Sequence, residues 1–119
     1  MRYLSEKEIS SYLHKSKTIQ YFTGYLEFNK VPTITWVSIQ VEDGEYLVLY
    51  HEVLSDDKEY DSVYNYPYAE PDDLYGKEIE TFDNLDDTLE FLKEEFKCIG
   101  EKFFIEGQLD DVLKEFPNE

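Results

Sequence analysis

The sequence contains few of the residue types on which disulfide-bonded, zinc-binding and nucleic-acid-binding proteins depend. It has one cysteine, which excludes an internal disulfide and a CxxC-type zinc site. Basic residues are also scarce, because 11 Lys+Arg stand against 28 Asp+Glu, for a net charge of −17 and a pI near 4.3. Binding to nucleic acid depends on a basic surface that contacts phosphates. We therefore expect no nucleic-acid partner.

Long apolar segments are missing as well. No run approaches the ~18 apolar residues of a membrane span, and the first residues, MRYLSEKEISSYLHK, contain no apolar core of a signal peptide. We expect a cytoplasmic protein without a membrane partner. The chain has 119 residues, of which 41% are hydrophobic and 17% aromatic, so residues 1–119 are predicted to fold as a single domain.

Local patterns predict an α+β fold, with a mainly antiparallel sheet (a meander) and helices at the N-terminus and in the C-terminal third. Ser5 followed by Glu8 fits the capping box of a helix over about 5–15. Asp43-Gly44 between two strand patterns predicts a tight hairpin. The remaining predicted elements are strands at 18–28 (with Gly24 as a bulge), 33–41, 46–54, 77–82 and 102–107, a helix from an Asp83 cap to near Gly100, and a helix at 109–116 before Pro117.

The negative charge lies almost entirely in residues 42–119. Two carboxylates about 4 Å apart repel by roughly 1 kcal/mol in water and by about 4 kcal/mol at an effective dielectric near 20. Adjacent acids therefore lower the stability of the fold, and they recur at Asp56-Asp57, Asp72-Asp73, Asp86-Asp87 and Asp110-Asp111. We expect something positively charged to compensate them.

A long acidic, tyrosine-rich loop at about 55–76 is the predicted site of that compensation. Ca²⁺ binds six to eight oxygen atoms, mostly carboxylates and carbonyls of a flexible loop. The predicted ligands are Asp56, Asp57, Glu59, Asp61, Glu70, Asp72, Asp73 and Asp83, and Asp86 and Asp87 at the next helix start are placed to close over the same ion.

The loop is not an EF-hand. Counted from Asp57, the sixth position is Ser62 instead of glycine and the twelfth is Tyr68 instead of glutamate. An irregular calcium site with a dissociation constant of about 10⁻⁶ to 10⁻³ M is predicted. The alternative is a solvated acidic loop that binds ions only diffusely.

The carboxylates bunched in SDDKEYD, AEPDD and DNLDD, in a single small domain that is acidic over residues 42–119, also suggest a family. In size and charge the whole chain resembles the small calcium-binding protein of heterocyst-forming cyanobacteria. The resemblance implies an intracellular protein that binds or sequesters calcium through surface carboxylates during signalling.

A basic protein partner is the second hypothesis. Inhibitors and immunity proteins of nucleases are small and acidic because they cover a basic active site. Tyrosines interleave with the acids of the loop, at Tyr60, Tyr64, Tyr66, Tyr68 and Tyr75. If the segment is extended, Tyr64, Tyr66 and Tyr68 form one aromatic face suited to binding. The alternative is that these rings fold back and cover the sheet.

Catalytic chemistry has little support in the sequence. His14 and His51 make no metal-binding motif, and His51 alternates with apolar residues as a core histidine does. Cys98 near a helix end is expected to pack rather than react. The sequence has no phosphate-binding glycine loop and no GxSxG motif. We expect no enzymatic activity.

Overall fold

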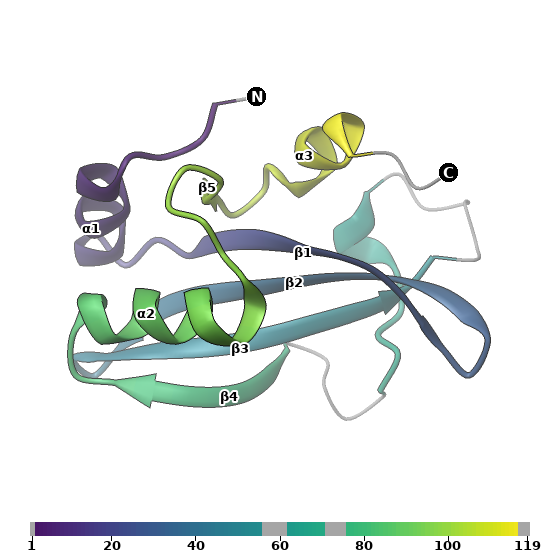
Figure 1. The fold of residues 1–119 in the computed structure, drawn as a ribbon, viewed down its shortest axis with the longest axis horizontal. Coiled ribbons are helices and arrows are strands. Elements are labelled where there is room, and N and C mark those ends of the chain that lie inside the picture. The colour runs from purple at the N-terminus through teal and green to yellow at the C-terminus, as the bar shows by residue number, and fades with distance from the viewer. Residues whose placement is uncertain (1, 56–61, 71–75, 117–119) are drawn as a thin grey trace.

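Five antiparallel strands form one sheet in the order β4-β3-β2-β1-β5, with helices packed on it (Figure 1). The computed structural model describes residues 2–55, 62–70 and 76–116. Its elements in chain order are α1 (Glu6–His14), β1 (Ile19–Phe28), β2 (Val31–Glu42), β3 (Glu45–Leu54), the 3₁₀ helix η1 (Val63–Asn65), β4 (Lys77–Phe82), α2 (Leu85–Phe96), β5 (Phe104–Ile105) and α3 (Leu109–Glu115). The predicted α+β class is confirmed.

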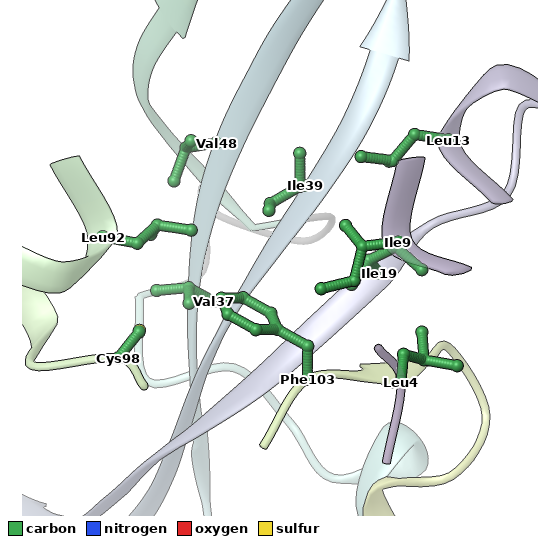
Figure 2. Packing of buried hydrophobic residues seen from close by; sticks show 10 residues of the cluster. All are labelled: Leu4, Ile9, Leu13, Ile19, Val37, Ile39, Val48, Leu92, Cys98 and Phe103. Carbon is green, nitrogen blue, oxygen red and sulfur yellow. The ribbon is translucent and has the colours of Figure 1, made fainter. Parts of the chain in front are cut away.

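One face of the sheet packs against α1 and α2. Val37 and Ile39 of β2 point to this face, together with Ile19 of β1 (Figure 2). The helices cover them with Ile9, Leu13 and Leu92, and the buried members of this first cluster are Leu4, Ile9, Leu13, Ile19, Val37, Ile39, Val48, Leu92, Cys98 and Phe103. Apolar side chains spaced three and four residues apart on each helix therefore meet side chains spaced two apart on the strands.

The opposite face packs against α3 and residues 63–68. Ile34 and Trp36 alternate with the first-cluster residues of β2 and point to this side. The buried members of this second cluster are Ile34, Trp36, Val53, Val63, Phe104, Leu109 and Val112. Phe103 and Phe104 are neighbours in the chain but belong to different clusters, so the β5 edge contributes to both sides.

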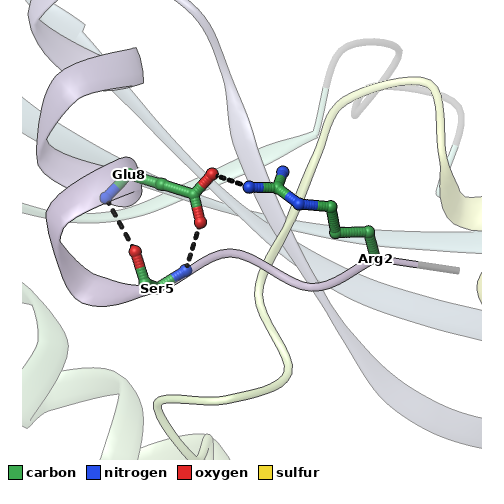
Figure 3. A network of polar contacts seen from close by, with 3 residues as sticks. All are labelled: Arg2, Ser5 and Glu8. Carbon is green, nitrogen blue, oxygen red and sulfur yellow. Dashed lines mark hydrogen bonds and ion pairs between the residues drawn. The ribbon is translucent and has the colours of Figure 1, made fainter.

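The local signals behave as predicted. Ser5 and Glu8 form the capping box of α1, and Arg2 contacts the Glu8 carboxylate (Figure 3). Asp43 and Gly44 both have positive φ, 52° and 80°, as a hairpin turn with two central residues requires. The pairing of β1 with β2 shifts register between Phe22 and Gly24, which is the predicted bulge.

Three boundaries differ from the predictions. The residue that caps α2 is Asn84 and not Asp83, because the Asn84 side chain accepts a hydrogen bond from the Asp87 amide at 2.8 Å. The helix ends at Phe96, before Gly100, because Lys97 adopts the left-handed conformation with φ of 59°. The last strand spans only Phe104–Ile105 within the predicted 102–107. No helix in the described residues has the length and apolar character needed to span a membrane.

Candidate functional site

The predicted calcium ligands lie mostly outside the described residues: Asp56, Asp57, Glu59, Asp61, Asp72 and Asp73. Glu70 lies beside the end of β3, because the adjacent Ala69 amide donates to the Glu52 carbonyl at 2.9 Å. Asp83 follows the far end of β4, where Phe82 pairs with Tyr46, six residues from Glu52 along β3 and therefore about 20 Å away at 3.3 Å per strand residue. One ion cannot be shared by Glu70 and Asp83, since calcium ligands lie about 2.4 Å from the ion.

Carboxylates do gather along one edge of the sheet. Tyr46 pairs with Phe82, which places the β2–β3 turn beside the connection from β4 to α2. We call the carboxylates of this region the acidic edge: Glu42, Asp43 and Glu45 of the turn, Glu78 and Glu80 of β4, and Asp83, Asp86 and Asp87 at the start of α2. The sequence shows these as three separate groups, and the antiparallel pairing of β3 with β4 makes them neighbours.

The acidic edge is a row and not a chelating cluster. All its carboxylates belong to exposed residues. In residues 2–55, 62–70 and 76–116, no group of three or more His, Cys, Asp or Glu is close enough to hold a metal ion. The ion pairs of these ranges join Arg2 to Glu8 and Lys114 to Asp111, and neither includes the acidic edge. Its charge is therefore not neutralised by cations of the described chain.

The described surface has a groove between α1 and α2, with a volume of about 1150 Å³. Its apolar lining comes from Leu4, Ile9, Leu89, Cys98 and Phe103, and its charged lining from Glu6, Glu8, Glu90, Glu94 and Glu101 with Lys93 and Lys97. Burial raises the pKa of the Cys98 thiol to about 12, so the side chain stays a neutral packing group as predicted.

Tyr64, Tyr66 and Tyr68 do not form the extended aromatic face, which is one of the two arrangements that the sequence allows. Residues Val63–Asn65 form a 3₁₀ helix, and all three rings pack against the second cluster. The Tyr64 hydroxyl donates to Gln20 Oε1 at 2.6 Å and accepts from the amides of Gly107 and Leu109 at 3.0 and 3.1 Å. These rings therefore cover the sheet, which is the other arrangement that the sequence allows. Tyr60 and Tyr75 lie outside the described residues.

His51 is a core residue with both ring nitrogens in hydrogen bonds, as its strand pattern suggests. Its Nε2 lies 2.8 Å from Ser38 Oγ and its Nδ1 lies 2.9 Å from the Tyr68 hydroxyl. The ring stacks on Trp36 with 4.9 Å between centroids. Burial lowers the pKa of His51 to about 4. Ser38 and His51 resemble a nucleophile and its base, but they are only 2% and 7% exposed.

Three comparisons with known proteins returned no match: no family model, no curated protein and no solved structure is similar to this chain.

Calcium binding stays a prediction of the sequence, and an NMR titration tests it. Millimolar Ca²⁺ is expected to shift the amide signals of Glu70 and of residues 83–87 saturably, and to raise the melting temperature by ligand linkage. Mg²⁺ serves as the control ion. Equal and unsaturated shifts with both ions would identify diffuse screening in place of a specific site.

Proposed function

We propose that this protein binds a basic protein and acts as an acidic inhibitor that covers the active site of a nuclease or another DNA-binding protein. The observation that carries the proposal is the arrangement of the acidic edge. Its carboxylates follow β4 and the first turn of α2 instead of converging on one point. A row of separated carboxylates suits several Lys and Arg side chains of a complementary surface better than it suits one ion.

The unneutralised charge supports the same function. Carboxylates without cationic partners repel each other in the free protein, and a basic partner removes that repulsion on binding. Complementary fields also steer the encounter, and steered association reaches about 10⁸–10⁹ M⁻¹s⁻¹ at low salt. A fast inhibitor of a damaging enzyme benefits from both effects.

A nuclease is the partner class whose chemistry fits this charge. Its active site is lined by cations that hold phosphates, so an array of carboxylates can occupy the same positions. Inhibition by such coverage requires no catalytic group in the inhibitor. The edge strand β4 carries Glu78 and Glu80 as exposed side chains, which places negative charge at the border of the sheet where a second protein can approach.

The proposed function is tested by reversing the charge of β4. The double variant Glu78→Lys/Glu80→Lys is expected to bind at least about tenfold more weakly, mainly through slower association, because exposed charges at an interface act on the encounter. The measurement is binding kinetics against a panel of purified nucleases with pI above about 9, at 50 and 300 mM NaCl.

The matched control is Glu27→Lys/Glu106→Lys, which changes the net charge equally. Glu27 lies on β1 and Glu106 follows β5, so both are away from the β4 edge of the sheet. Wild-type protein that binds none of the panel at 50 mM salt would contradict the proposed function. An equal loss of binding in the two double variants would assign the effect to net charge instead of the acidic edge.

A further inference from the structure

The segment between α2 and β5 lies between two hollows of the surface. On one side is the groove between α1 and α2, which Gly100 and Glu101 help to line. On the other side is a smaller cavity of about 220 Å³, lined by Tyr3, Tyr21, Phe22, Ile99, Lys102 and Phe116 with Val112. Tyr3 lines both hollows, so the groove and the cavity are neighbours.

Exposed apolar side chains mark the smaller cavity. The large hydrophobic side chains most exposed in the described chain are Leu26 at 56%, Ile99 at 55% and Phe116 at 40%. Ile99 and Phe116 both line the cavity. Exposed apolar side chains around a pocket, beside a charged rim, are typical of the anchor region of a protein interface.

We propose that the groove and the cavity form one docking surface for a Lys/Arg-rich segment of the partner, and that one apolar side chain of this segment enters the cavity. The proposal rests on the proposed function and adds to it a second contact, separate from the acidic edge, with its place and its chemistry. Glu90, Glu94 and Glu101 bind the cations, and Ile99 and Phe116 receive the apolar side chain.

The charges of the groove favour a basic occupant, because its lining holds five glutamates against two lysines, Lys93 and Lys97. Glu90 and Glu94 are four residues apart on α2, so their side chains lie on the same face of the helix. Neither they nor Glu101 take part in an ion pair within the described residues. Glu8 is already engaged by Arg2 and by the Ser5 amide (Figure 3). A second copy of this chain is disfavoured, because it would bring like charges together.

Lys102 selects an apolar side chain for the cavity. Its ammonium group lies 4.7 Å from the ring centroid of Tyr3 and 5.9 Å from that of Phe116. The faces of these two rings therefore already contact a cation, and a second cation in the cavity would be repelled. An apolar side chain meets no such repulsion and covers the exposed surfaces of Ile99 and Phe116.

The probe is a synthetic peptide, acetyl-Lys-Arg-Leu-Lys-Lys-Arg-amide, compared with the same peptide carrying serine in place of leucine. Both are titrated into the full chain and followed by amide NMR signals. The leucine peptide is expected to bind at least fivefold more tightly than the serine peptide. Its largest shifts are expected at Ile99 and Phe116 and along residues 90–94.

Ile99→Ser is expected to remove the difference between the two peptides. The matched control is Leu26→Ser, because Leu26 is equally exposed but lies in the β1–β2 hairpin and lines neither hollow. Glu94→Lys is expected to weaken the binding of both peptides by about the same factor, at least fivefold.

The inference would be overturned if the two peptides bound the wild-type protein equally, or if the leucine peptide did not bind. It would also be overturned if Ile99→Ser and Leu26→Ser changed the difference in affinity between the two peptides by the same amount. The nuclease measurements on the acidic edge are separate from these. Suppose that the protein binds a nuclease in a salt-dependent way that neither Ile99→Ser nor Glu94→Lys changes. That result would retain the proposed function and reject only this docking surface.

Discussion

Tyr64→Phe is expected to lower the free energy of unfolding by about 3 kcal/mol, because each buried polar group left unsatisfied costs about 1–3 kcal/mol. The removed hydroxyl is hydrogen-bonded to Gln20, Gly107 and Leu109. Gln20 is 2% exposed and Leu109 is fully buried, so water cannot readily replace the lost partner. Urea denaturation monitored by circular dichroism measures the change.

The matched control for this substitution is Tyr46→Phe. Tyr46 is a half-buried tyrosine that packs on the first cluster, and its hydroxyl makes no hydrogen bond within the described residues. Its replacement is expected to change the free energy of unfolding by less than about 0.5 kcal/mol. If the two variants lose similar stability, the Tyr64 hydroxyl does not join residues 62–70 to the start of α3 as described.

Acidification is expected to destabilise the protein through His51 by about 3 kcal/mol in total, since each pKa unit corresponds to about 1.4 kcal/mol. The pKa of His51 is about 4 in the folded protein, against 6.5 for an unperturbed histidine. Between these values the unfolded chain binds a proton that the folded chain does not. The stabilisation is therefore complete above pH 6.5 and is lost as the pH falls towards and through 4.

The pH effect of His51 is measured as the free energy of unfolding between pH 7.5 and 4, compared with His51→Gln. The wild type is expected to lose about 3 kcal/mol more than this variant over the range. The carboxylates titrate in both proteins, so the difference between the two pH profiles gives the contribution of His51. His14→Gln is the matched histidine substitution, because His14 is an exposed residue at the end of α1. Parallel profiles for wild type and His51→Gln would contradict the assigned pKa.

Sequence patterns leave the structure undecided where two local solutions are equally good or where a distant residue determines the conformation. Asp83 and Asn84 are both favoured caps, and only the hydrogen bond from Asp87 distinguishes them. The alternation of Tyr64, Tyr66 and Tyr68 suits a strand. The segment is held as a 3₁₀ helix by Asp110, which accepts from Ser62 Oγ at 2.6 Å and from the Val63 amide at 2.8 Å. No pattern near residue 64 indicates this contact.

The acidic edge and the proposed docking surface are similarly non-local. The acidic edge follows from the pairing of Tyr46 with Phe82, and the groove from the packing of α1 beside α2. The predicted calcium site instead combines acids of the 55–76 loop with those at the start of α2, because a sequence shows only proximity along the chain. The exposure of Ile99 and Phe116 is not apparent from the sequence for a related reason, since an apolar residue does not by itself show whether it is buried or exposed.

The sequence by itself determined the net charge, the α+β class and the features that arise within a few residues: the capping box, the Asp43-Gly44 turn and the bulge at Gly24. These depend on the backbone preferences of neighbouring residues. Only the tertiary structure decided which carboxylates are neighbours, which tyrosines are covered and where the described surface is hollowed. Those properties depend on contacts between residues far apart in the chain, and the hydrophobic packing that brings them together is not directional, so no local pattern specifies which elements meet.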